Sequence, residues 1–252
     1  MSFRRIHEVI HPWAESQPQA LALQDAGSRL TYGELEVSVL AAAEQLRALG
    51  VRAGDRVLMV AENCAALALT VLAASALDAW VVIVNARLSP REIDNFIEHS
   101  GARRVLYTTE VSADAMGHAT RAGATPQIWP GTGSIAAGPL NEAAVPEPVH
   151  EDPAEQVAAM IYTSGTSGSP KGVMLTHANL LFIAEVNRQL RRLGPLDKVY
   201  GVLPMAHVVG LSTQLIGSLS CGSALLLEAR FTPEALVRAI REESLTLMIG
   251  VP

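Results

Sequence analysis

Between residues 56 and 107, short apolar segments alternate with segments of helical length and pattern. The predicted strands cover residues 56–61, 80–84 and 103–107, and the predicted helices cover residues 63–77 and 90–99. Strands that are joined by helices pair in parallel, because right-handed crossovers return the chain to the same edge of the sheet. This stretch therefore predicts an α/β fold built on helix-covered, mostly parallel sheets.

The rest of the chain continues the same pattern. Two short strands at residues 20–24 and 28–32 flank a hairpin turn, and Thr31 with Glu34 forms a capping box that opens a helix. Further predicted strands cover residues 126–129, 157–161, 198–203, 223–227 and 245–249, and further helices cover residues 112–121, 177–193, 210–219 and 233–242. In residues 130–153 the composition shifts to glycine, proline, alanine and acidic residues, which predicts a surface connection or a mobile segment.

Composition excludes several classes of protein. The net charge of −6 provides no basic surface for nucleic acid. Residues 64–84 are apolar over a length that would cross a membrane, but Asp78 and many small residues favour a buried helix and strand, so we expect no transmembrane segment. The N-terminus has no signal peptide, and the two cysteines lie in apolar segments, which indicates buried thiols and a cytoplasmic location.

A loop rich in glycine and hydroxyl side chains follows the apolar run at residues 157–161. Residues 162–172 read YTSGTSGSPKG. Its glycines allow successive N–H groups to converge on one anion, its hydroxyls donate hydrogen bonds, and Lys171 carries a charge suited to phosphate oxygens. The spacing fits neither G-x-x-x-x-G-K-[ST] nor G-x-S-x-G. The loop therefore predicts polyphosphate binding of another kind.

A second glycine pattern carries no such prediction. Residues 131–136 formally match the dinucleotide fingerprint G-x-G-x-x-[GA]. The prolines that follow leave no room for the helix that this fingerprint must open, so the phosphate would face no helix N-terminus.

The loop resembles the signature of the adenylate-forming (AMP-binding) superfamily, [YF]-T-S-G-[ST]-[TS]-G-x-P-K-G. Residues 30–35 (LTYGEL), 54–57 (GDRV), 62–63 (EN) and 84–88 (VNARL) are also similar to that family. The segment LPMAHVVG at residues 203–210 is similar to the L-P-x-x-H-x-x-G of its acyl-CoA, aryl-CoA and luciferase branch. The resemblance covers essentially all 252 residues.

The resemblance implies two stacked α/β lobes within a large N-terminal domain, of which residues 1–252 would be part. Residues about 50–193 would form the first lobe, and residues about 10–48 plus 195–252 an incomplete second lobe. The family's later elements and its C-terminal domain are absent, so the chain resembles an N-terminal fragment that we expect to be inactive when isolated. The apolar final strand at residues 245–249 would leave an uncovered edge, which predicts self-association or pairing with the missing remainder.

The implied reaction is the activation of a carboxylic acid, fatty or aryl, by ATP and Mg²⁺ to an acyl-adenylate, followed by thioester formation with coenzyme A. The implied partners are therefore a small-molecule carboxylate, ATP and coenzyme A. One alternative is a non-catalytic nucleotide-binding or scaffold module that uses the same loop without turnover. A phosphotransferase fits less well, because no Asp or His stands at a kinase-like spacing from the loop.

Site residues follow from the same resemblance. The phosphate-binding loop would comprise Thr163, Ser164, Gly165, Thr166, Ser167, Gly168, Ser169, Pro170 and Lys171. Lys171 and Thr166 would act catalytically by offsetting the charge of the leaving pyrophosphate. His207 would line or gate the acyl pocket, whereas His177 is interpreted as structural. No residue is assigned as a metal ligand, because the cysteines and histidines lack the necessary spacing.

Overall fold

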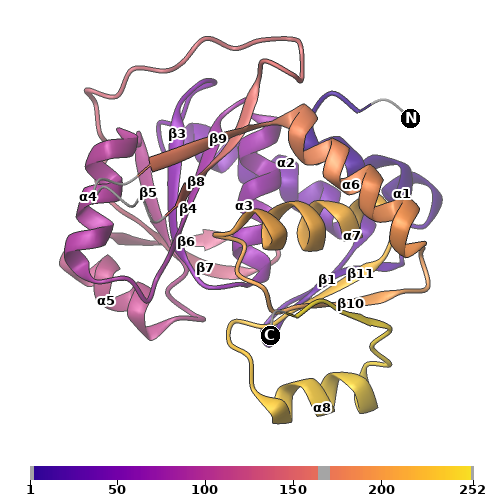
Figure 1. Cartoon of the computed structure of the whole chain (residues 1–252). Helices are drawn as coiled ribbons and strands as arrows, with labels where there is room; N and C mark the ends of the chain where they lie inside the picture. Colours follow the sequence, from indigo (N-terminus) through magenta and orange to yellow (C-terminus); the bar gives the residue numbers. More distant parts are fainter. Residues whose placement is uncertain (1–2, 164–170, 251–252) are drawn as a thin grey trace.

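The computed structural model describes residues 3–163 and 171–250, which fold around two β-sheets (Figure 1). One sheet has the strand order β6-β7-β5-β3-β4-β8-β9, and the other has the order β12-β10-β11-β1-β2. The strands of the first sheet are β3 (Arg56–Ala61), β4 (Trp80–Asn85), β5 (Arg104–Tyr107), β6 (Thr125–Trp129), β7 (Gly133–Ala137), β8 (Val157–Thr163) and β9 (Lys171–Thr176). Those of the second are β1 (Leu21–Gln24), β2 (Arg29–Thr31), β10 (Lys198–Gly201), β11 (Ala224–Leu227) and β12 (Leu247–Met248).

Parallel pairing dominates the middle of each sheet. In the seven-stranded sheet, β3 pairs in parallel with β4 and β5, and β4 pairs in parallel with β8. In the five-stranded sheet, β11 pairs in parallel with β1 and β10, and β10 with β12. The remaining strands, β2, β6, β7 and β9, pair antiparallel. The predicted α/β class with helix-covered, mostly parallel sheets is therefore confirmed.

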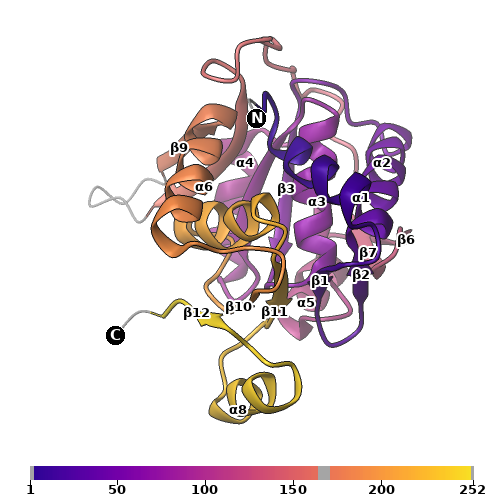
Figure 2. The ribbon, with the colours of Figure 1, turned by 90° about the vertical axis from the view of Figure 1, so that its right-hand side faces the viewer.

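Helices lie between the sheets and on their outer faces. Figures 1 and 2 place α2 (Tyr32–Ala48) and α3 (Ala65–Ala76) between the two sheets, and α4 (Pro90–Ser100) and α5 (Ala113–Arg121) on the outer face of the seven-stranded sheet. Along β3, Val57 and Met59 join the core shared with α2 and α3, whereas Leu58 and Val60 join the core under α4 and α5. Both faces of β3 are thus buried, as its continuous apolar run requires.

The other helices come from the N-terminal segment and from the chain after β9. They are α1 (His11–Ser16), α6 (His177–Arg191), α7 (Gly217–Ser220) and α8 (Pro233–Glu242), with a 3₁₀ helix η1 (Ile6–Ile10) and a π-helix η2 (Val209–Ile216). The segment at residues 64–84 forms α3 and β4, so the prediction of a buried helix and strand is correct. No helix within the described residues combines the length and apolar character that a membrane span needs. The lobe boundaries and the incompleteness of the second lobe stay predictions.

Two strands were not predicted. β7 lies inside residues 130–153, where only a connection was expected, and β9 follows directly on the loop. Gly133–Ala137 thus forms a strand rather than the helix that a dinucleotide fingerprint requires. Glycine and alanine have low β-propensity, so the sequence of β7 carries no strand signal, but β5 and β6 pair with it on both sides. β12 is shorter than the predicted strand at residues 245–249.

The connection that leads to β8 is fixed to the sheet by specific contacts. The Glu147 N–H donates to the Gly54 carbonyl (2.9 Å), and Arg56 pairs with the Glu147 carboxylate (2.7 Å). Gly54 has φ +80°, and a Cβ atom there would collide with the Glu147 carbonyl, so this crossing requires glycine. The alternative of a mobile segment at residues 130–153 is therefore wrong for this crossing.

The N-terminal segment packs against the buried His177 and places His7 beside Ser75. The Ile6 N–H donates to His177 Nδ1 (3.1 Å), and His7 Nδ1 lies 3.0 Å from Ser75 Oγ. Burial lowers the pKa of His177 to about 3 and the pKa of His7 to about 4. His177 is fully buried, which supports its structural interpretation.

Acidification is expected to destabilise this packing. The folded state excludes protons from His7 and His177, while the unfolded state binds them below its ordinary pKa of 6.5, so the free energy of unfolding falls as the pH drops from 6.5 towards 3. Each histidine contributes at most about 1.4 kcal/mol per pH unit.

Denaturant titrations between pH 6.5 and 3 measure how steeply the free energy of unfolding changes with pH. His177→Asn, which keeps an acceptor for the Ile6 N–H, should make this change less steep. His150→Asn, at a half-exposed histidine, is the control for the same substitution made away from this packing. An unchanged slope in His177→Asn would contradict the assignment.

Candidate functional site

The two ends of the glycine-rich loop meet at one edge of the seven-stranded sheet. Thr163 ends β8, Lys171 begins β9, and the two residues are partners in the antiparallel pairing of these strands. Both are exposed, so a hydroxyl and an ammonium group stand side by side at the carboxyl end of β8. Open α/β sheets bind ligands at this edge. The other predicted loop residues, Ser164, Gly165, Thr166, Ser167, Gly168, Ser169 and Pro170, lie outside the described residues.

Tyr162, the first residue of the loop motif, packs away from the loop. Its ring stacks on Phe96 of α4 with a centroid distance of 4.3 Å, and its hydroxyl lies 2.9 Å from His99 Nδ1. Burial raises the pKa of Tyr162 to about 12. This side chain therefore joins β8 to α4 and offers no hydroxyl to a ligand at the loop.

His207 is exposed on a turn just after β10. Its N–H donates to the Pro204 carbonyl (3.0 Å), and the π-helix η2 begins two residues later. A Cβ atom at Gly210 would collide with the Pro204 carbonyl, so the glycine of the L-P-x-x-H-x-x-G pattern is needed for this close approach. Gln214 of η2 then accepts from the Leu203 N–H (3.1 Å) and donates to the Tyr200 carbonyl (3.0 Å).

These predicted site residues are brought together only in part. Thr163 and Lys171 are neighbours on adjacent strands of one sheet, whereas His207 follows a strand of the other sheet. No hydrogen bond or ion pair between described residues joins His207 to Thr163 or Lys171. All three follow or flank the carboxyl ends of strands that run in parallel within their sheets.

An ion-pair network joins the carboxyl edges of the two sheets. Glu62 follows β3, and its side chain is only 2% exposed. Arg230, which follows β11, holds both carboxylate oxygens of Glu62 (2.8 and 3.2 Å), and Arg87, which follows β4, lies 3.5 Å away. Arg230 also contacts Asp114 at the start of α5 (2.8 Å), and its hydrogen bond to Glu62 raises the pKa of Arg230.

Sequence reasoning gave Glu62 and Arg230 no role. They are 168 residues apart, and each alone reads as a surface charge. The available signal was the position of Glu62 directly after the apolar run at residues 57–61, where a carboxylate must find partners or remain in water.

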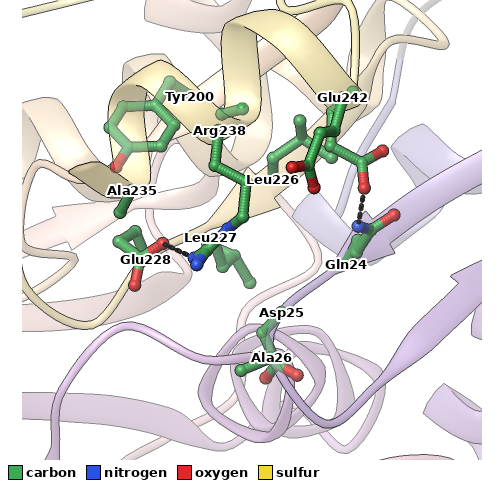
Figure 3. Close-up of a pocket in the computed structure, with 12 residues that line it drawn as sticks. Gln24, Asp25, Ala26, Tyr200, Leu226, Leu227, Glu228, Ala235, Arg238 and Glu242 are labelled. Carbon is green, nitrogen blue, oxygen red and sulfur yellow. Dashed lines mark hydrogen bonds and ion pairs between the residues drawn. The ribbon is translucent and has the colours of Figure 1, made fainter.

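A cavity of about 430 Å³ lies between α8 and the five-stranded sheet (Figure 3). Arg238 of α8 reaches towards Glu228 at 4.0 Å, and the Tyr200 hydroxyl has no hydrogen-bond partner in the described part of the chain. The charged groups of the lining are one guanidinium, Arg238, and four carboxylates, Asp25, Glu228, Glu242 and Glu243. This excess of carboxylates repels a triphosphate, so the cavity is not the phosphate site.

The described residues contain no cluster of side chains that could bind a metal ion. Within residues 3–163 and 171–250, no three His, Cys, Asp or Glu side chains are close enough to hold a metal ion. The exposed Lys171 ammonium and Thr163 hydroxyl do fit phosphate oxygens, because both are hydrogen-bond donors and one is a cation.

Comparison with known proteins gives consistent matches. The family profile described as "AMP-binding enzyme" matches residues 10–252. A feruloyl-CoA synthase from an Amycolatopsis species is 33% identical over 243 residues, which is 95% of this chain and 47% of that protein. The long-chain-fatty-acid–CoA ligase FadD13 of Mycobacterium tuberculosis is 31% identical over 238 residues, covering 93% and 46%. The chain thus spans about half the length of the curated relatives it matches.

Solved structures share the fold. The inhibitor-bound N-terminal domain of FACL13 from Mycobacterium tuberculosis aligns with a TM-score of 0.81 and 26% identity, covering 99% of this chain and 63% of that one. ATP-bound MatB from Rhodopseudomonas palustris aligns with a TM-score of 0.74 and 26% identity, covering 97% and 49%.

Glu62→Gln is expected to lower the melting temperature by roughly 5 °C, because it removes the buried charge that holds Arg230 and Arg87. Thermal unfolding of the variant and of Asp94→Asn measures the difference. Asp94 forms a bidentate pair with Arg121, but that pair is exposed and should contribute far less. Equal shifts of the melting temperature in the two variants would mean that the buried Glu62 network stabilises the protein no more than an exposed ion pair does.

Proposed function

Because this chain belongs to the AMP-binding enzyme family, we propose that it serves in the ATP-dependent activation of a carboxylic acid. The carboxylate oxygen attacks the α-phosphorus of ATP, pyrophosphate leaves, and an acyl-adenylate forms. The thiol of coenzyme A then attacks the acyl carbon, AMP leaves, and a thioester results. The observation that carries this proposal is the loop at residues 162–172, with Thr163 and Lys171 paired at the carboxyl edge of a parallel sheet.

The loop residues act in this proposal by position and charge. Lys171 and Thr163 are exposed donors at the ends of the loop, and Thr166 and its neighbours complete the set by sequence. Such donors stabilise the negative charge that develops on the departing pyrophosphate. Mg²⁺ would arrive with ATP as part of the substrate and would offset part of the negative charge of the phosphates.

His207 is proposed to line or gate the site of the carboxylic acid. It stands exposed at the carboxyl end of β10, on a turn held by Gln214 and by the close contact of Gly210 with Pro204. Its strand belongs to the sheet that does not carry the loop. The phosphate and acyl ends of the substrates would thus meet residues from different sheets.

The acid is proposed to be aryl or fatty. The matched relatives support both classes, since one is named a feruloyl-CoA synthase and another a long-chain-fatty-acid–CoA ligase. A cytoplasmic setting is supported by the two buried cysteines, Cys64 and Cys221, which are not joined by a disulfide.

The deciding experiment is ATP–pyrophosphate exchange with ferulate and with a long-chain fatty acid. It is run on this chain and on a longer form that covers the remaining half of the relatives' length. Exchange that depends on one of the acids supports the proposal and identifies the acid class. Binding of ATP without exchange in both forms would instead favour a non-catalytic nucleotide-binding or scaffold module.

Lys171→Ala is expected to reduce the exchange rate by roughly 100-fold, because it removes a preorganised cation from the phosphates. Folding should be nearly unaffected, since the side chain is exposed at the edge strand β9. Lys198→Ala, at the chain's other lysine, provides the matched control and should keep the exchange rate. Near-normal exchange in Lys171→Ala would show that the loop does not grip phosphate.

His207→Ala is expected to raise the KM for the carboxylic acid while leaving the KM for ATP unchanged. The reason is its place on the sheet that does not carry the phosphate loop. Both constants are measured in the same exchange assay, so ATP serves as the internal control. A change confined to ATP would contradict the acyl-site role.

A further inference from the structure

We propose that Asn63 is a positioning residue for His207. Asn63 follows β3 of the seven-stranded sheet, and it holds the turn after β10 of the other sheet on which His207 stands. The inference rests on the proposed function, because it assigns Asn63 the task of placing His207 for the carboxylic acid.

Three hydrogen bonds carry the inference. The Asn63 amide nitrogen donates to the Gly201 carbonyl (2.9 Å) and to the Leu203 carbonyl (2.8 Å). Its amide oxygen accepts from the Met205 N–H (2.9 Å). The side chain is therefore bonded on both sides of Pro204, and Asn63 is only 5% exposed.

The turn between β10 and His207 needs these side-chain hydrogen bonds because it lies beyond the backbone hydrogen bonds of the sheet. The strand pairing of β10 with β11 ends at Gly201, and Pro204 has no N–H to donate. The Leu203 N–H is taken by Gln214, and the Met205 N–H by Asn63. Asn63 and Gln214 are thus the side chains that replace the ladder between β10 and His207.

An amide is the group that fits these three partners. It offers two N–H donors and a carbonyl acceptor in one plane, whereas a carboxylate has no donor and a hydroxyl has a single one. The backbone next to Asn63 is itself fixed, because Glu62 is held by Arg230 and Arg87. A displacement of Asn63 would pass directly to the turn and to His207.

The test compares Asn63→Ala and Asn63→Ser with the unmodified protein in the exchange assay. Both variants are expected to lower kcat/KM for the carboxylic acid by roughly 10- to 100-fold, Ser less than Ala, because small misplacements of a site residue have effects of this size. The KM for ATP should change less than about twofold. In the background of His207→Ala, Asn63→Ala should have little further effect, because Asn63 acts through His207.

Asn187→Ala is the matched control. Asn187 is also 5% exposed, and its amide donates to a single carbonyl, that of Thr213 (2.9 Å). Its substitution should lower the melting temperature and change kcat/KM for the carboxylic acid far less than Asn63→Ala does. Melting curves establish that every variant is folded at the assay temperature, and Asn63→Ser carries the test if Asn63→Ala is not.

Each other outcome is decisive. Full additivity of Asn63→Ala with His207→Ala, or equal effects on ATP and on the acid, would overturn the positioning role. Failure of both Asn63 variants to fold would overturn it as well, since Asn63 would then be a requirement of the fold. If the unmodified protein shows no ATP–pyrophosphate exchange in either form, the proposed function fails. If the unmodified protein shows exchange and Lys171→Ala abolishes it, the proposed function stands, and the Asn63 variants then test only the positioning role.

Discussion

The buried carboxylate of Glu62 is the interaction on which the arrangement of the two sheets depends. A charge with 2% exposure is costly unless it is paired, and its partners follow β4 of its own sheet and β11 of the other. Because Arg230 holds both oxygens of Glu62, the segment after β11 of one sheet is held against the carboxyl end of β3 of the other. Ligands of open α/β sheets bind at such edges, so the contact that joins the two sheets also lies at the edge where the candidate site is proposed.

The parts of the fold that could be predicted are those specified by local sequence. β3, β4 and α4 were located to within a residue or two, because apolar runs and capping residues act over one turn or one strand. The Thr31–Glu34 capping box was also correct. β7 and β9 could not be predicted, since their Gly-, Ala- and Lys-containing sequences become strands only through pairing with β5, β6 and β8. Pairing partners distant in sequence leave no local pattern.

The same division holds for the candidate site. The loop and His207 stand out in the sequence because their residues are close together and unusual in kind. Gln214 does not, and Glu62 and Asn63 are marked only by their resemblance to the family, which gives them no role. Their roles come from partners in another element, and Asn63 bonds residues 138 and 140 positions away. Tyr162 is the opposite case. It belongs to the loop motif in the sequence, but its side chain packs on α4 by stacking on Phe96.

The π-helix after His207 has a consequence for how sequences of this family are compared. Each hydrogen bond in η2 spans one residue more than in an α-helix, so Val209–Ile216 contains surplus chain between two fixed ends. One end is fixed by the contact of Gly210 with Pro204, and the other by Asn187, which holds the Thr213 carbonyl and lies against Gly217. A relative that lacks one residue here would retain both anchors by closing the π-helix to an α-helix. The side chains between the two anchors would then be rotated around the helix axis relative to those of this chain. Residues that a sequence alignment pairs across this segment would therefore face different directions in the two proteins.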